Sequence, residues 1–436
     1  MQPDTPASPP SPKAERPPLP PGAWYAMQEA HWLGGNELYL LRGGDEYFPA
    51  LIRAVERAQF EIWFATYIFH DDAAAERVAQ ALAAAARRGV RVHVVVDGFG
   101  SHRALPKLQQ WLLPHGVALV VFRPLERWWN YLQPGQMRRL HHKLCVVDGV
   151  RAFVGGINVI DDRNDLHHGF GDAPRLDFAV ELTGPVVVPI EQTTRAVWSR
   201  AAFGHDWRRE VLAMMRSAEP LQDARRLMRQ VRMLPPENDQ PLDLTPVLAA
   251  FLVRDNLRQR RAIERGYIDA IRFATRRVDL ISPYFYPGRS FRRALVKAAR
   301  RGVKVRLLLQ GKIDYRLAGL AARVLYDELL AEGVEIHEYI PAFLHAKMAI
   351  VDDDWATVGS SNIDPLSLLL NLEANLVVRD LSFAGELAHE FERAVHVSKQ
   401  ITVAPFQKGA AAVLGRGFVA WLAHWYLRMA GTSGKY

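Results

Sequence analysis

The fold is decided by residues 50–97, ALIRAVERAQFEIWFATYIFHDDAAAERVAQALAAAARRGVRVHVVVD, and by residues 270–310, AIRFATRRVDLISPYFYPGRSFRRALVKAARRGVKVRLLLQ, which share one pattern. Each copy begins with the end of an amphipathic helix and continues through a short apolar run into a second helix. A run of β-branched or aliphatic residues closes each copy, at Val90–Val96 and at Val303–Leu309. A strand, a helix and a strand in this order predict a βαβ unit.

The second helix of each copy ends in the same five residues, Ala-Arg-Arg-Gly-Val, at 86–90 and at 299–303. Arginines in a last turn interact favourably with the negative end of the helix dipole, and the glycine that follows tolerates a positive φ. Because the strands are apolar throughout, we expect them to lie buried in a largely parallel sheet. The sequence therefore predicts an α/β protein built as a tandem duplication of one domain.

The chain has 436 residues, of which 49% are hydrophobic and 23% are charged. This composition is typical of a globular chain with a sizeable core, and it excludes wholesale disorder, collagen and coiled coil. The formal net charge is +8. An excess of that size indicates an anionic partner, which composition alone leaves open among nucleic acid, an anionic membrane and a phosphorylated substrate.

Cys145 is the only cysteine in the sequence. One thiol cannot form an internal disulfide or a multi-cysteine metal site, which agrees with a reducing cytoplasm. The first residues, MQPDTPASPPSPKAERPPLPPG, contain no apolar stretch of the secretory kind. No run of about 18 uncharged apolar residues occurs in the sequence either, so we expect neither a secretory signal nor a membrane-spanning helix.

Changes of composition along the chain divide it into segments. We predict a disordered proline-rich tail, two α/β domains of the same type, a basic helix and linker between them, and a C-terminal amphipathic helix. The tail covers residues 1–22, and the two domains cover 23–203 and 246–400. The basic helix and linker cover 204–245, and the C-terminal helix covers 401–436. The arginines of the segment between the domains form either a solvated helix face or a patch that faces phosphate or membrane.

A polar motif follows the βαβ unit in each half. It reads HHKLCVVDGVRAFVGGIN at residues 141–158 and HAKMAIVDDDWATVGSSN at residues 345–362, and both fit H-x-K-x4-D-x6-G-(G/S)-x-N. The matching positions are His141, Lys143, Asp148, Gly155, Gly156 and Asn158 in the first half, and His345, Lys347, Asp352, Gly359, Ser360 and Asn362 in the second. Two such occurrences, each downstream of a matching βαβ unit, indicate a functional site rather than coincidence.

The spacing within the motif suits a phosphate-binding site. In an extended strand the histidine and the lysine of H-x-K point to the same face, because strand side chains alternate. The small residues near the end of the motif let backbone approach a ligand closely, and the asparagine can donate a neutral hydrogen bond. An imidazole, an ammonium and an amide aimed together form a receptor for phosphate oxygens.

The doubled motif resembles the signature of the phospholipase D superfamily, over about residues 30–400. The resemblance implies two phospholipase D-type α/β domains related by pseudo-twofold symmetry, with a single active site at their interface. It implies that His141 attacks phosphorus to form a phosphohistidine and that His345 acts as general acid and base, although a pseudosymmetric site permits the reverse. The lysines and asparagines would hold phosphoryl oxygens, and neither a metal nor another cofactor is expected.

The same resemblance implies an acidic residue downstream of each histidine, which fixes the tautomer of the ring. The equivalent positions are Asp177 in LDFAVELTGP and Glu373 in NLEAN. Such a carboxylate orients the imidazole and supports the imidazolium, as the acid of a hydrolase triad does. Each carboxylate also has a plain structural explanation, as a solvated polar residue of a strand.

Further segments narrow the resemblance to bacterial cardiolipin synthases, most closely the B type, which lacks the N-terminal transmembrane hairpin of the A type. They are DFAVELTGP at 177–185, VRDN at 253–256 and SPYFYPG at 282–288. This family transfers a phosphatidyl group from one phospholipid, typically phosphatidylglycerol, to a hydroxyl of another and releases glycerol. The resemblance thus implies phospholipid substrates and a peripheral place on the cytoplasmic face of the bacterial inner membrane.

Two segments suit contact with an anionic phospholipid membrane. Residues 126–140, ERWWNYLQPGQMRRL, combine tryptophan and tyrosine with arginine, residues that settle among lipid headgroups. Residues 409–431, GAAAVLGRGFVAWLAHWYLRMAG, predict an amphipathic helix with a wide aromatic face and a cationic face, apt to lie in the membrane interface. The alternatives are a loop and a helix that pack against the protein itself.

Three classes of function therefore compete. The first is phosphatidyl transfer, the second is a hydrolytic phospholipase D or a nuclease, and the third is a non-catalytic lipid-binding protein. The duplicated chain and the aromatic C-terminal segment favour lipid over nucleic acid, because superfamily nucleases are often short chains with one motif. Intact histidines and lysines in both motifs argue against a non-catalytic protein. The sequence indicates neither the acceptor alcohol nor the oligomeric state.

Overall fold

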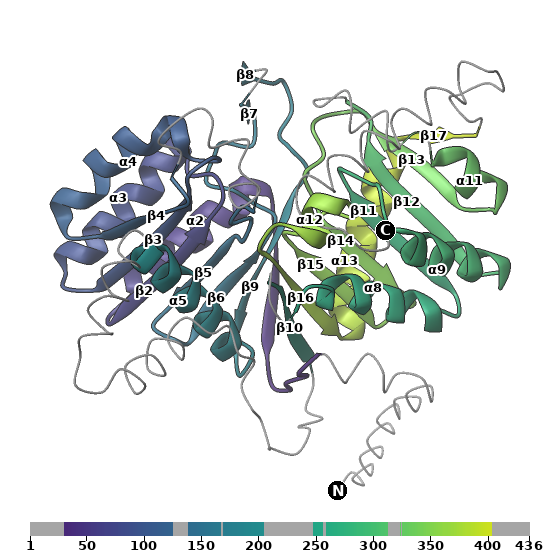
Figure 1. The fold of residues 1–436 in the computed structure, drawn as a ribbon, viewed down its shortest axis with the longest axis horizontal. Coiled ribbons are helices and arrows are strands. Elements are labelled where there is room, and N and C mark those ends of the chain that lie inside the picture. Colours follow the sequence, from purple (N-terminus) through teal and green to yellow (C-terminus); the bar gives the residue numbers. More distant parts are fainter. Residues whose placement is uncertain are drawn as a thin grey trace, which may run out of the picture.

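The structure is a computed structural model that describes residues 30–124, 138–166, 169–204, 247–255, 259–312, 323 and 325–402. The described chain forms two lobes, one from each half of the sequence (Figure 1). The predicted tail 1–22, the amphipathic segment 409–431, nearly all of 204–245 and most of 126–140 lie outside the described residues.

The first half contains one mixed sheet and the helices that cover it. Its seven strands lie in the order β1-β9-β6-β5-β2-β3-β4. The elements of this half are β1 (Glu37–Arg42), α2 (Gly43–Arg57), β2 (Glu61–Thr66), α3 (Ala73–Arg87), β3 (Arg91–Asp97), α4 (Leu105–Leu112), β4 (Ala118–Phe122), β5 (Leu144–Val147), β6 (Arg151–Gly155), the short ribbon β7 (Asn164–Asp165) and β8 (Gly169–Phe170), β9 (Phe178–Thr183) and α5 (Val187–Gly204).

The second half repeats this arrangement strand for strand. Its eight strands lie in the order β10-β16-β15-β14-β11-β12-β13-β17, so that only the edge strand β17 has no equivalent in the first sheet. The elements are β10 (Leu248–Arg254), α8 (Ala262–Phe273), β11 (Arg277–Ser282), α9 (Arg289–Arg300), β12 (Lys304–Gln310), α11 (Tyr326–Ala331), β13 (Glu335–Tyr339), β14 (Met348–Val351), β15 (Trp355–Gly359), α12 (Pro365–Leu369), β16 (Glu373–Arg379), α13 (Leu381–His396) and β17 (Lys399–Ile401).

The expectation of a largely parallel sheet was wrong. Only β2, β3 and β4 pair in parallel in the first half, as do β11, β12 and β13 in the second. The strands that carry the motifs, β5 and β14, pair antiparallel with both neighbours. A tight turn joins each of them to the next strand, and two strands joined so closely can only run antiparallel. The βαβ pattern therefore described three strands of each sheet and not the rest.

Both halves share one hydrophobic core between them. Helices α2, α3 and α4 cover the outer face of the first sheet, and α8, α9 and α11 cover the outer face of the second (Figure 1). The inner faces, with α5 and α13, contribute to a single cluster that spans the two halves, and strands β6 and β9 contact β15 and β16 across it. Representative members are Val154, Val180, Val358 and Leu376. This packing between the sheets determines how the two motifs face each other.

The first described residues of the chain belong to the second lobe. Ala30 and Trp32 are buried in the core of the second half. Leu33 exchanges backbone hydrogen bonds of 2.8 and 2.9 Å with Ala249 of β10. The amide of Asn36 then donates to the carbonyl of Leu33 at 2.7 Å, while its oxygen accepts from the N–H of Val186 at 3.0 Å. This crossing segment adds a second connection between the halves.

The helix ends follow the sequence prediction. Helix α3 ends at Arg87 and α9 at Arg300, and the glycines after them, Gly89 and Gly302, have φ of +93° and +88°. Only a residue without a Cβ adopts such a φ without strain, so the glycine stops each helix and turns the chain into the next strand. None of the helices in the described part of the chain is long and apolar enough to cross a membrane.

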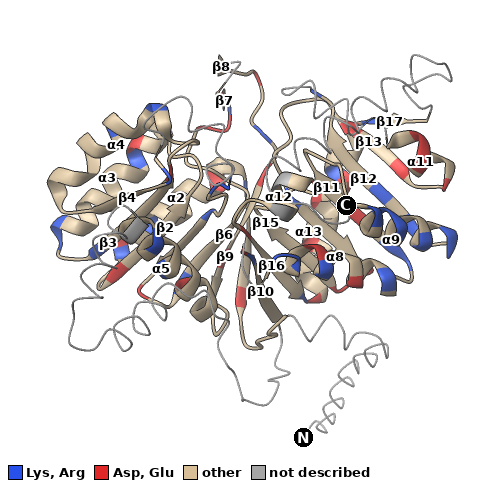
Figure 2. Cartoon of the chain, viewed as in Figure 1, with Lys and Arg blue, Asp and Glu red and all other residues tan. Residues whose placement is uncertain are grey.

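Basic residues are spread over both lobes, and helix α9 is the most densely basic element in Figure 2. It carries four arginines and a lysine within twelve residues. Two of these arginines, Arg292 and Arg300, pair with Glu328 and Glu332 at 3.3 and 2.5 Å. The charge of this helix is thus partly balanced by its neighbour α11, and the outer face of α9 reads as a solvated helix surface.

The aspartate of each motif closes the turn after the motif strand. Asp352 has a φ of +52°, and its carboxylate accepts hydrogen bonds of 2.8 to 3.2 Å from the N–H groups of Thr275, Arg276 and Arg277. Asp148, with a φ of +53°, does the same for residues 59–61. Each carboxylate therefore pins the connection between a helix and the first strand of its half.

This placement indicates a structural role for Asp148 and Asp352, which the motif predicts as catalytic residues together with its histidines and lysines. Each lies seven residues beyond its histidine, at the opposite end of the motif strand. Seven residues of extended chain span about 23 Å, so neither carboxylate reaches the groups that the histidines contact. The regular spacing of the motif reflects the length of this strand and its turn.

We predict that Asp352→Ala destabilises the protein without removing a reacting group. The variant leaves three N–H groups without their acceptor, of which that of Arg277 is half-buried, and places alanine at a positive φ, so we expect a loss of about 2 kcal/mol in the free energy of unfolding. Urea unfolding followed by circular dichroism measures it, with Asp352→Asn as the milder control. Loss of turnover at an unchanged unfolding midpoint would instead return Asp352 to the catalytic set.

Candidate active site

The halves are joined by backbone pairing in two equivalent places. Leu140 pairs with Leu372, and Leu176 pairs with Leu344, each in a parallel bridge. In the first bridge the residue after Leu140 donates its N–H to the carbonyl of Leu372 at 3.0 Å. In the second, the residue after Leu344 donates to the carbonyl of Leu176 at 2.8 Å. Each bridge thus fixes a motif histidine beside the residue that precedes the predicted acid of the other half.

Each motif histidine contacts a carboxylate from the other half of the chain. Nδ1 of His141 lies 2.9 Å from Oε2 of Glu373, and Nδ1 of His345 lies 2.6 Å from Oδ2 of Asp177. Along the chain Asp177 follows His141 and Glu373 follows His345, so each acid serves the histidine of the opposite half. Donation of Nδ1–H to a carboxylate leaves the lone pair on Nε2, which is the tautomer that a nucleophile needs. Neither half contains a complete pair.

The small residue near the end of each motif lies against the carboxylate. A Cβ added to Gly156 would lie 2.3 Å from Oδ1 of Asp177, so only glycine fits there. At the equivalent position Ser360 donates its hydroxyl to Oε2 of Glu373 at 2.6 Å and accepts the N–H of Ala374 at 3.0 Å. The motif predicts that these residues let a ligand approach. The structure instead makes Gly156 the space for one carboxylate and Ser360 a partner of the other.

Both motif lysines are buried beside their histidines. Nζ of Lys143 donates to the carbonyl of His141 at 2.9 Å, and Nζ of Lys347 donates to the carbonyl of His345. Burial lowers the pKa of Lys143 to about 7 and that of Lys347 to about 8, although the nearby carboxylates oppose this. At neutral pH the lysines are therefore close to losing their protons, and an anion bound between them would favour the charged forms.

The histidines have a lowered pKa as well. Burial lowers the pKa of His141, and Glu373 only partly opposes it. For His345, burial together with the charge of Lys347 lowers the pKa to about 3, against the opposing effect of Asp177. Both rings are consequently neutral near pH 7 before a substrate binds.

The two carboxylates stay ionised despite complete burial. Burial by itself would raise the pKa of Asp177, but the charge and the hydrogen bond of His345, with Lys347, outweigh it and hold that pKa below its ordinary value. Glu373 behaves in the same way, through His141 and the neighbouring lysine and serine. Within the described ranges, no group of three or more His, Cys, Asp and Glu residues could hold a metal ion.

The asparagines of the two motifs differ in their surroundings. Oδ1 of Asn158 accepts the backbone N–H of Ile68 at 3.2 Å, which anchors this amide. Oδ1 of Asn362 is buried and has no hydrogen-bond partner among the described residues. Buried acceptors without a partner are rare, so this oxygen is a point where a substrate group can complete the site.

Sequence reasoning missed two residues around His141. The centre of the Tyr67 ring lies 4.9 Å from the centre of the His141 ring, and Nζ of Lys143 lies 5.3 Å from the centre of the Tyr67 ring. Arg254 is buried opposite Glu373 in the antiparallel pair of β10 and β16, and its guanidinium donates to the carbonyl of Asn371. Tyr67 was hidden in an apolar run, and VRDN marked Arg254 only as part of a resemblance.

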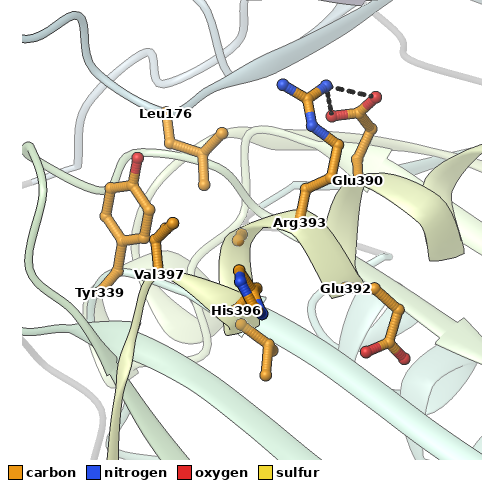
Figure 3. A pocket seen from close by; sticks show the side chains of 9 residues that line it. Leu176, Tyr339, Glu390, Glu392, Arg393, His396 and Val397 are labelled. Atoms are coloured by element: carbon orange, nitrogen blue, oxygen red, sulfur yellow. Dashed lines mark hydrogen bonds and ion pairs between the residues drawn. The ribbon is translucent and has the colours of Figure 1, made fainter.

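A cavity of about 710 Å³ borders the site at Leu176. Its other walls are Tyr339 and the last turns of α13, and Figure 3 shows Leu176 and Tyr339 on one side and the paired Arg393 and Glu390 on another. Of its lining residues only Leu176 also belongs to the bridges that position the histidines. The cavity is therefore a neighbour of the histidine pairs and not their centre.

The chain is similar to cardiolipin synthases over most of its length. Cardiolipin synthase B of Escherichia coli (strain K12) is 37% identical over 353 residues, which are 81% of this chain and 78% of that protein. Cardiolipin synthase A of Pseudomonas putida (strain GB-1) is 32% identical over 373 residues, 85% of this chain and 71% of that protein. These similarities confirm the resemblance drawn from the motifs.

The fold is also that of a solved enzyme. The crystal structure of phosphatidylserine synthase from Haemophilus influenzae Rd KW20 covers 93% of this chain and 97% of its own, with a TM-score of 0.64 at 13% identity. The family model described as "Cardiolipin synthase, PLD-like domain" matches residues 51–168 and 267–395, one range in each half. The duplication is thereby confirmed, and the chain belongs to the cardiolipin synthase family of proteins with phospholipase D-like domains.

Proposed function

We propose that the chain is a phosphatidyltransferase of the cardiolipin synthase type. It moves a phosphatidyl group from one phospholipid, such as phosphatidylglycerol, to a hydroxyl of a second phospholipid or another alcohol, and it releases glycerol. The observation that carries the proposal is the pair of exchanged His–carboxylate contacts within one site between the halves. The cardiolipin synthases to which the chain is similar support phospholipid substrates.

In the first step Nε2 of His141 attacks phosphorus. A P–N bond forms, the P–O bond to the leaving glycerol breaks, and the leaving oxygen takes a proton from Nε2 of His345. Lys143 and Lys347 hold the phosphoryl oxygens, where charge gathers in the transition state. Glu373 supports the positive charge that develops on the ring of His141, because its carboxylate accepts the Nδ1–H.

In the second step the acceptor hydroxyl gives its proton to Nε2 of His345 and attacks the phosphohistidine. The P–N bond breaks and the new P–O bond forms, so that His141 returns to its neutral state. His345 must carry a proton before the first step, although its pKa in the empty site is about 3. The bound phosphodiester supplies the negative charge that favours this proton, by opposing Lys347. The reverse assignment of the two histidines would use the same contacts.

The protein would work peripherally at the cytoplasmic face of the bacterial inner membrane. Phospholipid substrates require contact with a bilayer, and a net charge of +8 favours an anionic lipid surface. No contact with nucleic acid is needed for this function. Of the basic and aromatic segments expected to meet the membrane, the structure describes only residues 138–140.

We predict that the purified protein converts phosphatidylglycerol vesicles to cardiolipin and free glycerol in equal amounts. Transfer to a second lipid conserves the phosphodiester, whereas hydrolysis would give phosphatidic acid. Mass spectrometry of the extracted lipids, with an enzymatic assay of glycerol, measures both products. Phosphatidic acid without cardiolipin would make the chain a hydrolytic phospholipase D.

We predict that His141→Ala and His345→Ala each lower turnover by about a thousandfold or more, because the nucleophile and the acid act as one unit. The same vesicle assay measures the loss, and His102→Ala, which removes an exposed ring from the short helix His102–Ala104, is the matched control. Circular dichroism verifies that each variant is folded. Substantial activity in either site variant would rule out a shared two-histidine site.

We predict that a tetrahedral anion binds more weakly as the pH rises. Sulfate keeps its charge between about pH 6 and pH 9, whereas Lys143 and Lys347 lose their protons near pH 7 and pH 8. Binding favours the protonated lysines, so the dissociation constant should rise by about tenfold or more from pH 7 to pH 9. Isothermal titration calorimetry measures it. Lys143→Met should flatten this dependence, and an equally steep curve in that variant would contradict our assignment.

A further inference from the structure

Because of the pseudo-twofold symmetry, residues of the first half can be compared with the equivalent residues of the second half. The N–H of Gly98 donates to the carbonyl of Phe122 at 2.8 Å, and the N–H of Gly311 donates to the carbonyl of Tyr339 at 3.0 Å. Phe122 is the last residue of β4 and Tyr339 is the last residue of β13, and after each comes one residue and then a proline. Residue 123 of the first half therefore corresponds to residue 340 of the second.

A second pair of contacts extends the correspondence to the histidines. The N–H of Leu140 donates to Oδ2 of Asp97 at 2.8 Å, and the N–H of Leu344 donates to Oε1 of Gln310 at 2.7 Å. Asp97 and Gln310 are the last residues of the equivalent strands β3 and β12. Residues 138 and 139 thus correspond to 342 and 343. The same scaffold surrounds both histidines, and differences between equivalent side chains report different tasks.

Three of these positions change from basic to apolar. The first half has Arg123, Arg138 and Arg139, which we call the arginine cluster, and the second half has Ile340, Ala342 and Phe343. The exposed side chain of Ile340 shows that the second half presents an apolar group there. The substitution of three cations by apolar residues makes the surroundings of the two histidines electrically unlike.

The arginine cluster is a connected structure. Nη1 of Arg123 donates to the carbonyl of Arg138 at 3.0 Å, and Nη1 of Arg139 donates to the carbonyl of Arg123 at 3.3 Å. The guanidinium of Arg139 also lies 5.3 Å from the centre of the ring of Phe99. These contacts to backbone oxygens and to an aromatic face orient the guanidinium groups.

The cluster brings together three positively charged side chains. The acid beside Arg139 is Asp97, whose Oδ1 lies 4.0 Å from Nη1 of Arg139 and also accepts the N–H groups of Phe99 and Gly100. Nε of Arg138 is buried and has no hydrogen-bond partner among the described residues. Burial and the charges of its two arginine neighbours lower the pKa of Arg123 to about 10. Such a group of partly buried guanidiniums is stabilised by an anion.

The cluster lies beside the reacting groups. Arg139 stands two residues before His141 on extended chain, so both side chains point to the same face, about 7 Å apart along the backbone. The side chains of Arg139 and His141 are both 11% exposed. Both side chains therefore have some access to solvent.

The charges beside His345 are mixed in sign. Arg175, which comes from the first half, donates to the carbonyl of Asn164 at 2.8 Å and lies 4.0 Å from Oδ2 of Asp165. Lys312 donates to the carbonyl of Pro341 at 3.0 Å. The cavity of Figure 3, with Leu176 and Tyr339 in its wall, opens on this side. The asymmetry is thus between a neighbourhood with three clustered arginines and one whose charges are mixed in sign.

We propose that the arginine cluster is a second phosphate-binding site, which holds the phosphate of an acceptor alcohol while the two motifs hold the phosphate that reacts. The proposal rests on the phosphatidyl transfer proposed above and assigns the residues that bind the phosphate of the acceptor. In a glycerol phosphate headgroup, the carbons of glycerol separate the free hydroxyl from the phosphate. That separation matches the step along the backbone from His141 to Arg139.

The phosphate in the cluster takes no part in bond making. During the second step the acceptor hydroxyl loses its proton to His345 and forms the P–O bond, while the P–N bond to His141 breaks and the acceptor phosphate stays as it was. Arg138 and Arg139 are positioning residues in this scheme. They hold the hydroxyl near the phosphohistidine, so they act on the affinity for the acceptor.

The first test compares two soluble acceptors, sn-glycerol 3-phosphate and glycerol, with phosphatidylglycerol in detergent micelles as the donor. We expect the protein to prefer the phosphorylated acceptor, and the variant Arg138→Gln/Arg139→Gln to lower that preference by about tenfold or more through KM for the acceptor. Both acceptors are soluble, so altered binding to a membrane does not affect the ratio.

Two variants serve as controls for this test. Arg138→Lys/Arg139→Lys keeps the charge and should retain part of the preference. Arg77→Gln/Arg103→Gln removes two charges from exposed positions on α3 and on the short helix His102–Ala104, and should leave the ratio unchanged. An equal use of both acceptors by the unaltered protein, or a preference that survives in the glutamine variant, would overturn the proposal.

The second test needs no turnover. Isothermal titration calorimetry with sn-glycerol 3-phosphate should detect a site that remains in Lys143→Met/Lys347→Met and disappears when Arg138→Gln/Arg139→Gln is added. Inorganic phosphate is the comparison probe. Equal affinity for both probes would mean a site for free phosphate and would reject an acceptor site, as would the absence of binding. If no acceptor is used in the first test, the proposed transfer fails, while this titration still decides whether the second site exists.

Discussion

The structure depends on two short backbone pairings that cross between its halves. The bridges Leu140–Leu372 and Leu176–Leu344 place each motif histidine beside the residue before the opposite carboxylate. The buried histidine and carboxylate can then satisfy each other, which neither could do inside its own half. The shared core between the sheets holds these segments in place, so the stability of the interface and the chemistry of the site rest on the same contacts.

Much of this arrangement was predictable from sequence, because local patterns repeat. The helix stops, the duplicated unit and the positions of the histidines and lysines follow from periodicity and spacing. The pairing of Asp177 with His345 and of Glu373 with His141 does not follow from them. Along the chain each acid comes after the histidine of its own half, and only the packing of the two halves brings it to the opposite histidine. Asp148 looked catalytic because a turn residue that closes a strand keeps as regular a spacing as a reacting group. Parallel pairing was predicted for too many strands, because the apolar pattern of a buried strand does not reveal the direction of its neighbours.

The symmetry of the scaffold contrasts with the asymmetry of the groups on it. Glu373 has the hydroxyl of Ser360 as a partner, whereas Asp177 faces the bare backbone of Gly156. The oxygen of Asn158 is anchored and that of Asn362 has no partner in the described chain. A two-step reaction asks different things of its two histidines, since one bonds to phosphorus and the other moves a proton. Equivalent backbones with unlike neighbours meet that demand.

The crossing bridges have a consequence for how such a site can change. An interface in which residue i of one copy meets residue j of the other, and j meets i, is the kind that a symmetric dimer of a single half would form. In such a dimer every substitution appears twice, on both sides of the axis. In one continuous chain each substitution appears once, so a cation can be gained at Arg139 while Phe343 stays apolar. Covalent fusion of the halves thus allows the two sides of one pseudosymmetric interface to carry different side chains.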